Sequence, residues 1–193
     1  MRLPYVISEI LAAVAEAKAA TIGVPMAIAI VDGEGGLQFF KRIDGTLPVS
    51  TELAISKAYT AAAVRVPTHT LGELAQPGGP LYGIQHTHGG KIVLFGGGYP
   101  LSVEGKVVGG IGVSGGTVEQ DMQVAEPAVQ MLQYIECWAN ELRPLVPHAN
   151  GNSSWTTLPA VREKLLRAIR GLSPPIPEST VEALTGGVLL ALN

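Results

Sequence analysis

Residues 95–121 read FGGGYPLSVEGKVVGGIGVSGGTVEQD, and this stretch decides how the chain around it is organised. Two apolar runs, 99–103 and 106–113, flank a Glu-Gly pair of the kind that turns a β-hairpin. A helical pattern over 117–142 follows at once, with acidic residues in its first turn, where negative charge is favourable. The stretch therefore predicts an antiparallel strand pair that runs into a long helix.

The same patterns, followed outward, predict the rest of the fold. We expect helices over 5–21, 50–64 and 117–142, a short helical turn over 69–74, and strands over 26–31, 37–42, 91–95, 99–103 and 106–113. Because most connections between strands are hairpins, the order α-β-β-α-β-β-β-α predicts a five-stranded antiparallel sheet with packed helices. This is an α/β (α+β) sandwich of the PAS or profilin type.

The character of the chain changes after residue 143. We expect one domain over 1–143 and, over 144–193, a linker followed by an amphipathic helical tail. The tail helix over 158–172 is typical of a peptide that docks on a shell or enzyme partner through 158–192. Packing on its own subunit or on a neighbouring one is an equal alternative, and binding to a membrane surface is a weaker one.

Composition excludes several classes of protein. The net charge of −3 argues against a nucleic-acid-binding module, which needs concentrated positive charge. No apolar run is as long as the ~18 residues of a membrane span. A single cysteine, Cys137, forms no internal disulfide, which favours a reducing, cytoplasmic location. Charged residues make up only 15% of the chain, which hints that much of its surface is covered by other copies in a homo-oligomer.

Two glycine clusters mark a candidate ligand site. Residues 96–98 leave backbone amides bare between two expected strands, and residues 114–116 lead into a helix N-terminus, which attracts anions. Either cluster alone is more often a turn, but one hairpin joins them. We therefore expect a pocket here for a small anionic or planar ligand.

The chain resembles the GlcG/HbpS family, which includes haem-binding HbpS proteins, the C-terminal domain of PduO-type corrinoid adenosyltransferases, and OrfY proteins. The resemblance spans about residues 5–142 and rests on 52–61, 67–69, 76–78, 81–83, 95–100 and 109–121. It implies the same sandwich fold, assemblies from dimers to octamers, and haem or a corrinoid as the ligand. The OrfY and PduO relatives imply a location inside a bacterial microcompartment.

The candidate ligand contacts share positions that match the family or lie in the glycine clusters. They are Lys57, Thr68, His69, Gly96, Gly97, Gly98, Ser114, Gly115 and Gly116. Lys57 is interpreted either as a cation for a carboxylate or as part of a solvated helix face. His69 is interpreted either as structural or as a ligand or catalytic residue.

His86 and His88 stand two residues apart in a long expected loop. That spacing suits a metal if both side chains turn the same way, and either residue is also a candidate haem ligand. No cysteine or acidic partner is near in sequence, so a surface position is the alternative.

Three functions follow from these features. The first is a non-enzymatic accessory protein that binds haem or a corrinoid. The second is an enzyme for a small carbonyl or hydroxy-acid metabolite, with Lys57 or His69 in acid–base roles and the amides of Gly115 and Gly116 holding a carboxylate. The third is a microcompartment protein that docks through its tail.

Overall fold

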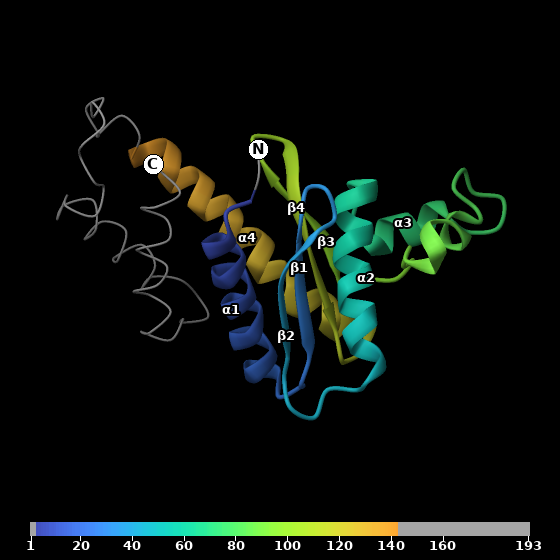
Figure 1. The fold of residues 1–193 in the computed structure, drawn as a ribbon, viewed down its shortest axis with the longest axis horizontal. Coiled ribbons are helices and arrows are strands. Elements are labelled where there is room, and N and C mark those ends of the chain that lie inside the picture. Colours follow the sequence, from blue (N-terminus) through green and yellow to red (C-terminus); the bar gives the residue numbers. More distant parts are fainter. Residues whose placement is uncertain (1–2, 143–193) are drawn as a thin grey trace.

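The computed structural model describes residues 3–142, which form a sandwich of helices around one sheet (Figure 1). The helices are α1 (Tyr5–Ile22), α2 (Val49–Val64), α3 (Thr68–Leu74) and α4 (Val118–Leu142). The strands are β1 (Ala27–Asp32), β2 (Leu37–Arg42), β3 (Gly98–Val103) and β4 (Lys106–Ser114). Two short 3-10 turns, η1 (Ile84–His86) and η2 (His88–Gly90), lie between α3 and β3. The predicted tail over 144–193 lies outside the described residues.

The sheet has the order β2-β1-β4-β3, and every neighbouring pair is antiparallel. Helices α1 and α4 cover one face, and α2 covers the other (Figure 1). Strand β1 is apolar from Ala27 to Val31 because both of its faces are covered there, and it ends in the half-buried Asp32. The predicted antiparallel α+β arrangement with packed helices is therefore confirmed.

The predicted strand over 91–95 is wrong, so the sheet of the described residues has four strands rather than five. The order along the chain is α-β-β-α-α-β-β-α, with η1 and η2 before β3. The Thr60 hydroxyl of α2 accepts from the backbone N–H of Val93 at 3.0 Å and lies 3.2 Å from the carbonyl oxygen of Lys91. A helix side chain thus satisfies the Val93 N–H, a group that a strand would have offered to the sheet.

The two faces of the sheet pack against side chains of different sizes. Large aliphatic side chains, including Met26, Ile28 and Ile30, fill the layer beneath α1 and α4. On the other face, Ala27, Ala29 and Val31 pack against Ala54, Ala58 and Ala62 of α2. A Cβ atom at Gly110 or Gly112 of β4 would overlap backbone atoms of α2. Small residues on both sides therefore let α2 approach the sheet closely, and this places Lys57 against the end of β4.

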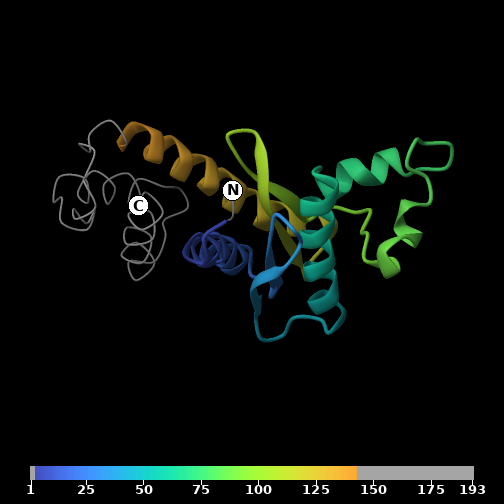
Figure 2. The same ribbon diagram turned by 45° about the horizontal axis from the view of Figure 1, so that its top comes forward.

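Helix α3 begins against β3, where Thr68 bonds to Gly98. With the 3-10 turns it forms an arm, residues 68–91, that extends away from the sheet on the side of α2 (Figure 2). Turn hydrogen bonds hold the arm in shape, among them Leu81 N–H to the Leu74 oxygen at 3.1 Å. Tyr82 is 65% exposed there. Within residues 3–142, no helix has both the length and the apolar character that crossing a membrane requires.

Candidate functional site

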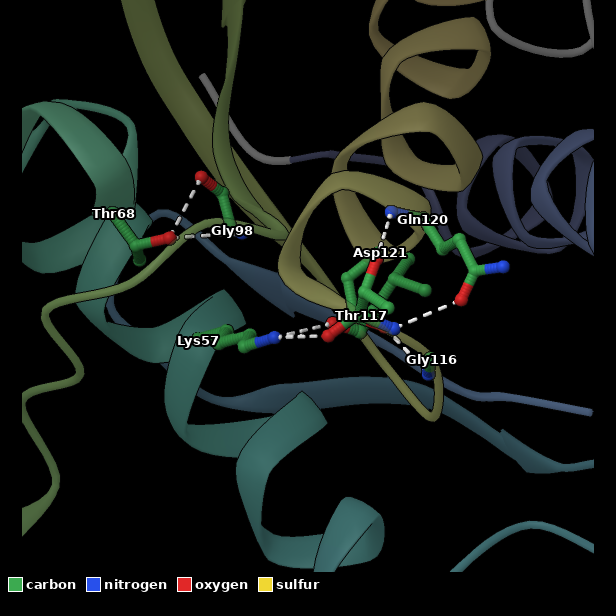
Figure 3. A network of polar contacts seen from close by, with 8 residues as sticks. Lys57, Thr68, Gly98, Gly116, Thr117, Gln120 and Asp121 are labelled. Carbon is green, nitrogen blue, oxygen red and sulfur yellow. Dashed lines mark hydrogen bonds and ion pairs between the residues drawn. The ribbon is translucent and has the colours of Figure 1, made fainter. Parts of the chain in front are cut away.

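Lys57 lies in a buried ion pair at the centre of the predicted site (Figure 3). Its ammonium nitrogen is 2.6 Å from Asp121 Oδ2 and donates to the Val113 carbonyl oxygen at 3.0 Å. The ring of Phe95 lies over it, with the centroid 4.8 Å from Nζ. Lys57 has no exposed surface, so the interpretation as part of a solvated helix face is wrong. The pair joins α2, the end of β4 and the first turn of α4.

The electrostatics of the pair are those of a charge taken out of water. Burial lowers the pKa of Lys57, and the hydrogen bond and charge of Asp121 raise it again in part. A buried ammonium without such a partner would cost several kcal/mol or lose its proton. Lys57 in this buried position therefore requires Asp121 as the partner of its charge.

The first turn of α4 is already supplied with acceptors from its own chain. Asp121 Oδ1 accepts from the backbone N–H of Gly116 at 3.0 Å. Gln120 Oε1 accepts from the N–H of Thr117 at 2.9 Å, and the Thr117 hydroxyl lies 3.3 Å from the N–H of Gln120. This is a reciprocal capping arrangement. One amide of the expected anion site, that of Gly116, thus binds a side chain of this protein, as does the amide of Thr117 that follows it (Figure 3).

The glycines at 96–98 are buried, and the backbone N–H of Gly98 is not bare. The Gly98 N–H donates to the Thr68 hydroxyl at 3.0 Å, and the Gly97 oxygen accepts from Val113 N–H at 2.8 Å. A Cβ at Gly97, where φ is 108°, would lie 2.9 Å from Lys57 Nζ. These glycines let the chain pass close to the ion pair.

The structure brings most of the candidate ligand contacts into one cluster. Lys57, Thr68, Ser114 and the glycines at 96–98 are buried in it. Gly116 is exposed and Gly115 is half-buried, so these two form the accessible rim. Direct contact between this cluster and a ligand stays a prediction.

Asp121 is the residue that sequence reasoning missed. A carboxylate in the first turn of a helix is favourable in itself, so its position called for no further explanation. One signal was present in the sequence. Lys57 falls among the alanines of α2 that face the sheet, such as Ala54 and Ala58, and a lysine on such a face needs a buried acid. The sequence does not say which acid supplies it.

His69 lies at the start of α3, apart from the ion pair. Its ring packs against Tyr99 of β3, with 5.7 Å between the centroids. Its Nδ1 atom is buried and has no hydrogen-bond partner among the described residues. The Tyr99 hydroxyl donates to Glu126 at 2.9 Å, and burial, followed by Glu126, raises the pKa of Tyr99.

His86 and His88 are both exposed on the arm. His86 Nε2 lies 3.4 Å from the side-chain nitrogen of Gln85, and His88 Nδ1 lies 2.8 Å from the Thr87 hydroxyl. Within residues 3–142, no group of three or more His, Cys, Asp or Glu side chains is placed to hold a metal ion. The metal site at the two histidines stays a prediction.

Comparison with known proteins agrees with the resemblance seen in the sequence. Residues 6–130 match the model of the family described as haem degrading protein HbpS-like. The corrinoid adenosyltransferase PduO of Citrobacter freundii is 48% identical over 112 residues, which are 58% of this chain. This chain spans only 33% of that PduO, which is about a third of the relative's length.

Two solved structures are similar along nearly their whole length. Protein ORFY of Klebsiella pneumoniae has 34% identity and a TM-score of 0.67, covering 69% of this chain and 92% of that one. The PduOC–haem complex has 42% identity and a TM-score of 0.65, covering 67% of this chain and 94% of that one. On these grounds the chain belongs to the HbpS-like family.

Proposed function

We propose that this protein is an accessory protein that binds haem or a closely related tetrapyrrole. The observation that carries the proposal is its similarity to PduOC, which is 42% identical and whose crystal structure is a haem complex. The donor set of the described residues suits the group. Three histidines are present, and two of them, His86 and His88, are exposed on the arm beside the exposed Tyr82.

Histidine would supply an axial ligand to the iron of a bound haem, and an exposed aromatic ring offers apolar contact to the macrocycle. Lys91 is exposed close to the histidines and has no acidic partner among the described residues, so it suits a propionate. The corrinoid alternative has less support. The shared region is a third of PduO, so the activity in that protein's name is not assigned to this chain.

Haem titration of the full chain tests the proposal. We expect a shifted and intensified Soret band that saturates at a fixed ratio of haem to protein in the micromolar range. The heat-unfolded chain is the control for non-specific haem uptake. A parallel titration with cobalamin, followed in the visible spectrum, tests the corrinoid. An unchanged haem spectrum at micromolar protein contradicts the proposal.

Three finer expectations belong to the same proposal. The protein forms a homo-oligomer, the rim of the glycine cluster at Gly115 and Gly116 is the alternative to the arm as the place that the ligand touches, and residues 158–192 dock on a shell or enzyme partner in a microcompartment. Light scattering after gel filtration measures the first. The variant Phe95→Ala tests the second, because Phe95 is 41% exposed and its ring lies over the Lys57 ammonium group within the cluster.

The enzymatic alternative has a specific obstacle. Two groups were expected to do acid–base chemistry. Lys57 has no exposed surface, and His69 is packed against Tyr99. A substrate would reach Lys57 only if the groups around its ammonium, among them the ring of Phe95, moved aside. The binding function needs no such opening.

A further inference from the structure

The three described histidines differ in which ring nitrogen is free to bind a metal. This difference matters because the iron of a haem needs one unprotonated, accessible imidazole nitrogen. A second group often fixes that state by binding the other nitrogen of the ring. The hydrogen bonds of each histidine therefore rank them as iron ligands.

The hydrogen bonds around Thr87 determine the tautomer of His88. The Thr87 hydroxyl donates its single proton to the Ile84 carbonyl oxygen at 2.6 Å. The same oxygen lies 2.8 Å from His88 Nδ1, so in this contact the ring nitrogen is the donor. In the neutral imidazole the proton is then on Nδ1, and the lone pair is on Nε2.

The backbone also holds His88 in a particular direction. Its φ is 53°, and the two residues that follow, Gly89 and Gly90, have φ values of 66° and 80°. A residue with a Cβ atom rarely adopts this conformation, and residues that do so are found at functional sites. The His88 ring also leans on Tyr59 of α2, with 6.4 Å between centroids. The side chain of this exposed histidine is thus directed by two contacts, with Thr87 and with Tyr59.

The other two histidines lack this combination. The Nε2 atom of His86 is engaged by the Gln85 amide at 3.4 Å. His69 is packed against Tyr99 and has its Nδ1 enclosed. Of the histidines in residues 3–142, His88 alone is exposed, directed and left with an unengaged Nε2.

We propose that His88 binds the haem iron through Nε2 and that Thr87 is its positioning residue. This inference rests on the proposed function and adds which residue holds the iron. Lys91, whose ammonium lies 5.8 Å from the centroid of the same Tyr59 ring, is the cation nearest to this ligand along the loop. The haem then sits on the arm rather than at the glycine cluster.

The experiment compares single variants of the full chain in haem titrations, followed by the Soret band and by electron paramagnetic resonance. His88→Ala removes the imidazole-ligated spectrum, and added imidazole restores it. His86→Ala is the matched control two residues away, and it keeps that spectrum, as do His69→Ala and His148→Ala. Thr87→Val weakens haem binding about tenfold, whereas Thr87→Ser does not.

A measurement without haem separates this inference from the proposed function. Long-range proton–nitrogen NMR of the apo chain reports the tautomer, and we expect the proton of His88 on Nδ1 in the wild type and redistributed in Thr87→Val. A wild-type chain that binds no haem overturns the proposed function and this inference together. Haem binding with an unchanged spectrum in His88→Ala, or a proton found on Nε2, overturns this inference and leaves the proposed function standing.

Discussion

Lys57 and Asp121 are 64 residues apart in the sequence and meet almost without exposed surface. Two properties of that pair decide how the domain responds to substitution. The charges are desolvated, so each depends on the other. Their remaining hydrogen bonds reach Val113 and Gly116, so the pair also fixes the end of β4 and the loop after it. Its main effect should therefore be on stability.

The first prediction is that Lys57→Met lowers the free energy of unfolding by about 3–5 kcal/mol, because it leaves the Asp121 carboxylate buried and unpaired. Urea unfolding followed by circular dichroism measures the change. Lys41→Met is the matched control, since Lys41 pairs with Glu16 at 2.7 Å while 46% of its side chain is exposed. That substitution should cost about 1 kcal/mol or less. Equal effects of the two substitutions would contradict the account.

The pKa of Lys57 predicts a pH dependence with a definite sign. Burial lowers this pKa below the ordinary value of 10.5, so between the lowered value and 10.5 the unfolded chain binds more protons than the folded one. The free energy of unfolding of the wild type therefore rises with pH in that interval. Measured by urea unfolding from about pH 8 to about pH 10, its advantage over Lys57→Met should widen. A narrowing advantage would contradict the lowered pKa.

At the scale of elements, the contact of α2 with β4 depends on glycines of β4, which have no side chain to hold the helix away. A Cβ at Gly112 would overlap the carbonyl oxygen of Ala54, and the nearest backbone nitrogen, that of Ala58, would be 2.5 Å away. The helix lies directly on the strand, so it must shift to admit even a methyl group. That shift would also move Lys57, which the same turn of helix carries.

The prediction at this scale is that Gly112→Ala lowers the free energy of unfolding by about 3 kcal/mol or more, as overpacking of a close contact does. Thermal or urea unfolding measures the loss. Gly33→Ala serves as the control, because Gly33 is exposed and an added Cβ there would meet its neighbours at an ordinary 3.4 Å. A Gly112→Ala variant as stable as Gly33→Ala would show that α2 has room to move.

The elements also show how far the sequence leads and where it stops. Periodicity predicted α1, α2, α4 and four strands to within a few residues, since each buries a regular face. The same reasoning failed at 91–95, where Ile92 and Val93 are buried without belonging to a strand. A run of branched apolar residues indicates that a segment is buried. It does not indicate what its backbone bonds to, and here the partner is Thr60, which is distant in sequence. The pairing of Lys57 with Asp121 was out of reach for the same reason.

At the scale of the whole molecule, the question is whether the described domain depends on the rest of the chain. The family match ends at residue 130, and the PduOC structure is 94% covered by 67% of this chain. The structure of that relative therefore has no segment that corresponds to the remaining third of this chain. The HbpS-like domain should accordingly carry its own core, which α1, α4 and the sheet enclose.

The last prediction is that a chain of residues 1–143 unfolds cooperatively, with a midpoint within a few degrees of the full chain, since removing segments outside a core costs little. Circular dichroism on heating measures the midpoint, and light scattering measures the oligomeric state of both chains. Full-length Leu165→Glu, on the apolar face of the expected tail helix, is paired with Arg167→Glu on its other side. If the tail docks on a partner, only Leu165→Glu abolishes docking, and neither variant shifts the midpoint. A truncated chain that melts without cooperativity, or changes its oligomeric state, would make the tail part of the folded core or of the subunit interface.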